Sequence, residues 1–238
     1  MRRAITVLFL PLAACGTIGN SGGAESAGAK ISRTYSANGF DAVRLRGSDN
    51  VEISTGKDFS IHATGSEKAI ERLEVKVDDG VLTIGTKRNS GWSWGSRGSA
   101  TVRVTMPELH GAAIDGSGDM TVDRAQGDFN GSIAGSGDLA VGMVEGGRVA
   151  LSIAGSGSLS AAGRADDLSI SIQGSGDVRA RDLKASSATV SIAGSGDATA
   201  IVDGPATVSV MGSGDVDLGP GARCTKHKMG SGDIRCGA

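Results

Sequence analysis

Apolar and polar residues alternate along the second half of the chain, on both sides of a repeated four-residue motif. The motif is Gly-Ser-Gly-Asp in six copies and Gly-Ser-Gly-Ser in one, and the copies begin 18 to 20 residues apart, at Gly116, Gly135, Gly155, Gly174, Gly194, Gly212 and Gly230. The positions two and four before the first glycine, and four and six after it, are mostly apolar. Because side chains two apart in a strand share a face, the pattern predicts strand, tight corner, strand, with one face inward.

A period near 19 residues is typical of stacked coils, in which each coil buries its apolar face against its neighbours. The position two before the first glycine is aliphatic in six repeats, at Ile114, Ile133, Ile153, Ile172, Ile192 and Val210. In the last repeat Lys226 and Lys228 occupy the inward positions, and we expect them to form the polar cap that a terminal repeat needs. The sequence therefore predicts an all-β, right-handed β-helix or β-solenoid stack, with its regular coils over residues 111–238.

Residues 31–110 lack the motif but show shorter stretches of strand-like alternation. Gly47 to Asn50 forms a diverged corner between two such stretches. Asp78-Asp79-Gly80 predicts a hairpin turn, and Ser66 predicts the N-terminal cap of one short helix over Glu67 to Leu73. We expect a less regular β-rich first half that continues into the coils as one domain, residues 31–238.

Residues 1–14 have the pattern of a secretory signal peptide. The apolar run from Ala4 to Ala14 is too short to cross a hydrocarbon core of about 30 Å. Leu12-Ala13-Ala14-Cys15 resembles the bacterial lipobox, which implies cleavage before Cys15 and lipid attachment to it; a chance cysteine in an ordinary signal peptide is the alternative. No Asp follows Cys15. By resemblance to Gram-negative lipoproteins, this implies that the protein is placed in the outer membrane, and whether it faces the periplasm or the cell surface is left open. Residues 15–30 are rich in Gly, Ser and Ala and predict a flexible tether.

The other two cysteines, Cys224 and Cys236, predict a disulfide in an exported protein. Glycine supplies 39 of the 238 residues and aromatic residues only 3%, so large rings cannot fill the core. The formal charge of −2 leaves no basic excess for neutralising phosphates, and we expect no nucleic-acid partner. The three histidines are scattered, and no Ser-His-Asp arrangement can be argued from the sequence. We therefore expect neither an enzyme nor a cofactor.

The corner aspartates allow two interpretations. They are Asp119, Asp138, Asp177, Asp197, Asp215 and Asp233, and stacking places successive ones about 4.8 Å apart. Their repulsion must be offset by backbone donors, by solvent or by a cation. Calcium takes six to eight oxygen ligands, whereas each coil supplies one carboxylate and Ser158 interrupts the row. We expect turn capping and no designed metal site, while weak, nonspecific binding of divalent cations stays open.

A candidate binding loop lies between the strand-like stretches Val81 to Ile84 and Thr101 to Met106. It contains both tryptophans of the chain, Trp92 and Trp94, followed by Arg97. In an extended segment the two rings point the same way, which suits stacking on sugar faces or on an apolar partner. The alternative is that the rings pack back onto a neighbouring sheet.

The β-rich first half, Met-Pro-Glu-Leu at 106–109 and the serial Gly-Ser-Gly-Asp corners together resemble the bacterial head GIN domain, a family labelled as auto-transporter adhesins. The resemblance covers roughly residues 38–236 and implies a β-helix-like fold on exported, often lipid-anchored envelope proteins. It supplies no catalytic residues. We expect a lipid-anchored envelope protein carrying a non-catalytic binding or adhesion module, with an envelope glycan or protein as its partner. The alternatives are a passive structural or envelope-stress lipoprotein and, less favoured, a polysaccharide-active enzyme.

Overall fold

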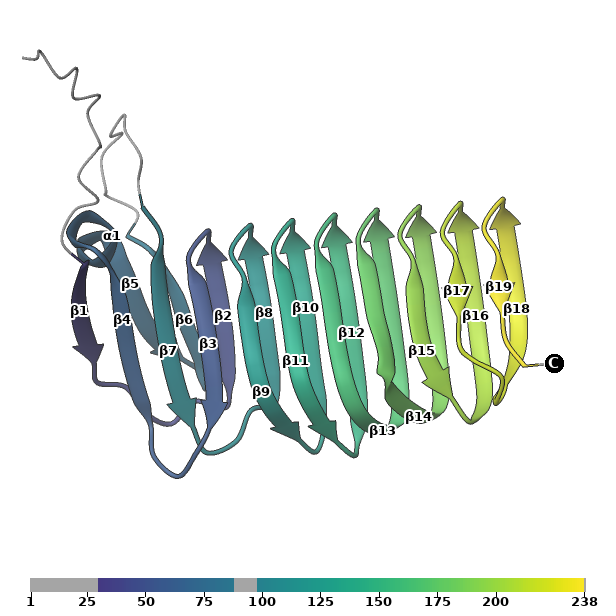
Figure 1. Cartoon of the computed structure of the whole chain (residues 1–238), viewed down its shortest axis with the longest axis horizontal. Coiled ribbons are helices and arrows are strands. Elements are labelled where there is room, and N and C mark those ends of the chain that lie inside the picture. Colours follow the sequence, from purple (N-terminus) through teal and green to yellow (C-terminus); the bar gives the residue numbers. More distant parts are fainter. Residues whose placement is uncertain (1–29, 88–97, 238) are drawn as a thin grey trace, which may run out of the picture.

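The computed structural model describes residues 30–87 and 98–237, which form one short helix and nineteen strands. The elements are β1 (Lys30–Tyr35), β2 (Ala42–Gly47), β3 (Asn50–Thr55), β4 (Ser60–Ser66), α1 (Glu67–Arg72), β5 (Leu73–Asp78), β6 (Val81–Thr86), β7 (Ala100–Met106), β8 (Gly111–Gly116), β9 (Met120–Gln126), β10 (Phe129–Gly135), β11 (Asp138–Glu145), β12 (Arg148–Gly155), β13 (Ser158–Gly174), β14 (Asp177–Gly194), β15 (Ala198–Val202), β16 (Gly204–Gly212), β17 (Val216–Asp217), β18 (Ala222–Gly230) and β19 (Ile234–Arg235). The predicted all-β stack is confirmed (Figure 1).

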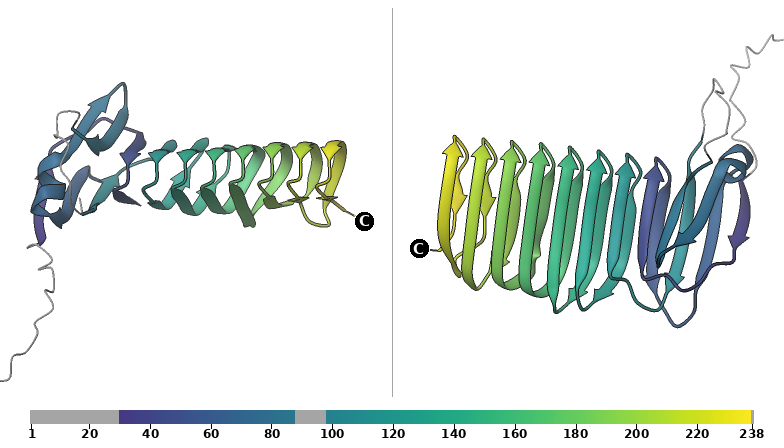
Figure 2. Two further views of the ribbon diagram at one scale, coloured as in Figure 1. Left: turned by 90° about the horizontal axis from the view of Figure 1, so that it is seen from above. Right: turned by 180° about the vertical axis from the view of Figure 1, so that it is seen from behind.

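Two series of strands run along the stack. The strands that precede each corner pair in the order β5-β6-β2-β8-β10-β12-β13-β14-β16-β18. The strands that follow each corner pair in the order β1-β4-β7-β3-β9-β11-β13-β14-β15-β17-β19. The long strands β13 and β14 belong to both series. All these pairings are parallel except β1–β4, β4–β7 and β5–β6 at the N-terminal end. Figure 2 shows the regular coils from above and from behind.

The predicted inward columns are aligned in the stack. Ile133 pairs in register with Ile114 on one side and with Ile153 on the other, and the same column continues through Ile172 and Ile192. All five side chains are buried. They belong to a single apolar cluster that extends from Phe40 to Ala222. The cluster consists almost entirely of aliphatic residues, as the low aromatic content requires.

The chain does not build the stack strictly in sequence order. The coil formed by β2 and β3 lies between β8 and β9 on one side and β6 and β7 on the other. After β3 the chain therefore leaves this coil, forms the N-terminal end of the stack and returns through β8 to the opposite side of the same coil. The sequence pattern predicted the strands from β2 onward in this half, but neither β1 nor the order in which the strands pair.

The local predictions for the first half also hold. Ser66 caps α1 by accepting a hydrogen bond at Oγ from the backbone N–H of Ala69, at 3.3 Å. The hairpin between β5 and β6 turns through Asp79 and Gly80, which have φ values of 48° and 77°. Positive φ at both central positions is what a tight two-residue hairpin turn requires. In the part of the chain that the structure describes, no helix has the length and apolar character needed to cross a bilayer.

Candidate functional site

Four of the residues singled out from the sequence lie outside the described part of the chain. These are the expected lipid-attachment residue, Cys15, and the three residues of the expected binding loop, Trp92, Trp94 and Arg97. Their roles stay predictions. The strands before and after the loop are present, because β6 ends at Thr86 and β7 begins at Ala100.

The carboxylates of the corner aspartates join successive coils. In five of the six, all but Asp233 of the last coil, Oδ1 accepts a hydrogen bond from the backbone N–H of the corner residue one coil later. The pairs, donor first, are Asp138 to Asp119 at 3.1 Å, Ser158 to Asp138 at 2.9 Å, Asp197 to Asp177 at 3.2 Å, Asp215 to Asp197 at 2.8 Å and Asp233 to Asp215 at 2.7 Å. Ser158 has no carboxylate, and there the N–H of Asp177 donates to the carbonyl of Gly157 at 3.1 Å. The corner can therefore close with or without an acid.

Through these hydrogen bonds the row of aspartates connects neighbouring coils of the fold. A hydrogen bond to an ionised acceptor stabilises the charged carboxylate, so backbone donors offset part of the repulsion between neighbouring coils. Within residues 30–87 and 98–237, no group of three or more His, Cys, Asp or Glu side chains has the arrangement of a metal site. The aspartates thus act as corner caps in a row that Ser158 interrupts.

Both glycines of the corner are required by the stacking. At the first, Gly194, φ is +142°, and an added Cβ would lie 2.0 Å from the carbonyl oxygen of Gly174 in the preceding coil. At the second, Gly196, an added Cβ would lie 2.0 Å from the carbonyl oxygen of Gly176. The positive φ of a tight corner accounts for the first glycine, whereas the second is needed because of its contact with the preceding coil, which was not predicted. The recurrence of that glycine in all seven motifs, including the one with Ser158, was the available signal.

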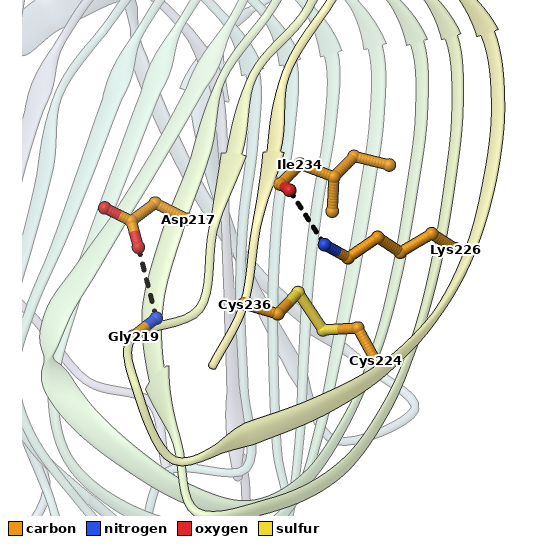
Figure 3. Close-up of a disulfide and its surroundings, with 6 residues drawn as sticks. All are labelled: Asp217, Gly219, Cys224, Lys226, Ile234 and Cys236. Carbon is orange, nitrogen blue, oxygen red and sulfur yellow. Dashed lines mark hydrogen bonds between the residues drawn. A yellow bond between two sulfur atoms is a disulfide. The ribbon is translucent and has the colours of Figure 1, made fainter. Parts of the chain in front are cut away.

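The C-terminal end of the stack carries a disulfide between Cys224 and Cys236. The bond joins β18 to the residue that follows β19, with a Cα–Cα distance of 6.1 Å (Figure 3). Beside it, Nζ of Lys226 donates a hydrogen bond at 3.0 Å to the carbonyl of Ile234, so the lysine also links the two strands. The end of the core is therefore closed by a covalent link and a polar side chain.

The last coil also exposes strand edges, which the repeat pattern alone did not indicate. β18 pairs only with β16, and β19 pairs only with β17, within the described residues. The inward column that reads Val208 and Val210 in the previous coil continues as Lys226 and Lys228, and both lysines are exposed. The open end of the stack is thus lined by cations.

A hollow of about 570 Å³ lies at the junction between the first half and the regular coils. Its lining includes Lys57 after β3, Glu108 in the segment between β7 and β8, and Arg124 of β9. Leu109, which is fully buried, also contributes to the lining. The hollow is partly open to solvent.

Glycan cleavage needs clustered carboxylates, and the outward column through Arg179 and Asp217 does not gather them. Arg179, Thr199 and Asp217 do share this column in register. The arginine pairs with Asp177 of its own coil at 2.9 Å, and Asp217 pairs with Arg181 at 3.1 Å. These are exposed surface ion pairs, and they do not form the facing pair of carboxyl groups that glycoside hydrolysis uses.

Comparison with known proteins adds the family. A model described as "Putative auto-transporter adhesin, head GIN domain" matches residues 39–219. No curated protein matches in sequence.

Three solved structures have the same fold. A "putative adhesin" from Bacteroides fragilis NCTC 9343 has a TM-score of 0.76 at 19% identity, covering 87% of this chain and 97% of that one. A "putative lipid binding protein" from Parabacteroides distasonis ATCC 8503 has a TM-score of 0.65 at 23% identity, covering 87% and 96%. A "putative adhesin" from Parabacteroides merdae ATCC 43184 has a TM-score of 0.59 at 17% identity, covering 87% and 95%. Since the family model spans most of the chain, this protein belongs to the head GIN domain family.

Proposed function

We propose that the protein is exported to the cell envelope, held there by lipid at Cys15, and uses its β-solenoid as a non-catalytic binding and adhesion module. The observation that carries the proposal is the placement of the two ends. The described chain begins with β1 at one end of the stack and finishes beside β19 at the opposite end (Figure 1).

An anchor before β1 would therefore hold the stack by one end. A tether of the kind that composition predicts before β1 would have a root-mean-square span of about 20 Å over 15 residues. From the corner at Gly47 to the corner at Gly230 the stack adds seven steps of about 4.8 Å, or roughly 34 Å. With this geometry the C-terminal end can extend well away from the anchoring membrane and reach a partner.

The family description as adhesins supports the same function. An adhesive module needs a rigid surface more than it needs reactive groups, and the in-register coils with one continuous core supply that surface. We expect the partner to be an envelope glycan or protein. The loop with Trp92 and Trp94 is the candidate contact, since exposed rings stack well on sugar faces.

The anchor and the adhesion are tested together in cells. A clickable fatty acid should label the wild type and leave Cys15→Ser unlabelled, and protease treatment of intact cells should digest the domain if it faces outward. Cells expressing the wild type should attach to a second cell layer or to a glycan-coated surface more than cells expressing Cys15→Ser or the double variant Trp92→Ala with Trp94→Ala. Equal labelling would refute the anchor. If the fatty acid labels the protein but cells without it attach equally well, the alternative is favoured, namely a passive structural or envelope-stress lipoprotein.

A further inference from the structure

The outer edge of β18 is a strand edge that the fold leaves unpaired among the described residues, as are the outer edges of β1 and β5 at the opposite end. All nine residues of this strand pair in register with β16 on one side. On the other side no strand pairs with it among the described residues, and it lies at the extreme end of the stack (Figure 1). An unpaired strand edge offers a row of N–H and C=O groups to which another extended chain can add.

The charges around this edge are strongly one-sided. Residues 220–237 contain four cationic residues, Arg223, Lys226, Lys228 and Arg235, against one acidic residue, Asp233, in a chain whose formal charge is −2. All four cationic residues are exposed. None of them has a carboxylate within ion-pair distance in the described part of the chain. A locally positive end on an acidic protein is a feature that a partner can recognise by charge.

The lysines select the kind of strand that can pair with this edge. A strand added to β18 would place its side chains about 4.8 Å from those of β18, with every second one over Lys226 and Lys228. A second copy of the chain, added edge to edge by a two-fold axis, would set these lysines against their own counterparts. Like charges brought this close repel, whereas acidic side chains in the same places attract the lysines.

We propose that the β18 edge binds an extended, acidic segment of a partner protein, which adds to the stack as one more strand with acidic residues at alternate positions. A lipid surface or a flexible polyanion could use the four cationic groups, but neither would use the nine-residue backbone edge. The inference goes beyond the proposed function, because it names the partner of the distal end and holds whether or not the protein is anchored.

The probe is a fluorescent ten-residue peptide of alternating Glu and Val, titrated against the purified mature protein. We expect saturable binding that weakens as salt is raised. The double variant Lys226→Glu with Lys228→Glu should lose at least tenfold in affinity and should gain binding of a peptide of alternating Lys and Val. The matched control is Arg164→Glu with Lys184→Glu, which makes the same change of net charge at two paired, exposed positions in the middle of the stack. This control should bind the Glu peptide within about twofold of the wild type.

A second peptide separates strand addition from simple charge attraction. The same Glu and Val sequence, N-methylated throughout, keeps its charge but cannot donate backbone hydrogen bonds, and it should lose binding. Equal binding of the methylated peptide, or equal loss in both double variants, would overturn the proposal. So would saturable binding of phosphatidylglycerol vesicles through Lys226 and Lys228 with no binding of the peptide. Circular dichroism of each variant verifies that the stack is folded.

Discussion

The two ends of the stack are closed in different ways. At the N-terminal end the core is covered by other elements: α1 buries Ala69 and Ile70, and the antiparallel strands β1 and β4 pack beside it. At the C-terminal end nothing among the described residues covers the last coil. There the column of aliphatic residues gives way to Lys226 and Lys228, and a disulfide ties the two strands together.

The covered end bears mainly on the stability of the fold, whereas the open end bears on what partner can bind. Covering a core with apolar side chains yields burial energy, on the order of 25 cal/mol for each Å² removed from water. Ending a core with exposed lysines yields little such energy, but it leaves a strand edge available and determines what can pair with it. The N-terminal end should therefore be sensitive to substitution, whereas the C-terminal end should tolerate exchange of its lysines and lose binding specificity instead.

The largest effect is expected at the covered end. Ile70→Asp puts a carboxylate at a position that is fully buried between α1 and the sheet, and it should lower the free energy of unfolding by more than about 4 kcal/mol or prevent folding. Lys68→Asp, on the exposed side of the same helix, should change it by less than about 0.5 kcal/mol. Denaturant titration followed by circular dichroism measures both. Similar losses in the two variants would show that α1 does not close the core.

A smaller loss is expected when the open end loses its covalent link. Replacing Cys224 and Cys236 by Ser removes a disulfide with a sequence separation of 12, and loop-closure entropy sets the expected loss at about 3 kcal/mol. Because each coil contacts only its neighbours, β18 and β19 should lose hydrogen-exchange protection before the middle coils do. Wild-type protein treated with reductant is the control and should match the double variant. Unchanged protection of β18 in both samples would mean that Lys226 and strand pairing hold this end without the link.

The sequence predicted the regular coils better than the ends. In the coils the apolar column, the corner and the period all repeat, so seven copies of one pattern define strands, inward face and register together. The first half has no repeat, and its strands could be recognised without their order, because the placement of β2 between β6 and β8 depends on contacts far apart in the sequence. Asp49 illustrates this. The sequence pattern placed it in a diverged corner, whereas in the structure it is buried, accepts a hydrogen bond from the N–H of Ala100 at 2.8 Å and lies 3.8 Å from Arg72. No pattern in the neighbouring sequence predicts that Asp49 contacts Ala100 and Arg72.

The candidate site residues also divide into those that the sequence predicted and those that only the structure identified. The pairing of Cys224 with Cys236 was predicted because the expected lipidation of Cys15 leaves two cysteines. The row of aspartates was predicted from the recurrence of one residue at each corner. The free edge of β18 required knowledge of which strand comes last and what lies beside it. The sequence did predict Lys226 and Lys228 as a cap, but their meaning for a partner depends on the unpaired backbone next to them.

The smallest effect is expected between the two ends, where neighbouring coils support every corner. Asp197→Ser removes the carboxylate that accepts the N–H of Asp215 at 2.8 Å. The chain already contains this exchange at Ser158, where the next N–H bonds to the carbonyl of Gly157, so the same alternative should limit the loss to about 1 kcal/mol or less. Ser158→Asp, the reverse change, should be neutral or slightly stabilising by thermal melting. Because these carboxylates already accept backbone hydrogen bonds, millimolar calcium should leave the melting temperatures of both variants and of the wild type unchanged. A calcium-dependent rise in the wild type that Asp197→Ser abolishes would instead identify the row as a cation site, and the corners would then depend on an ion as well as on their backbone donors.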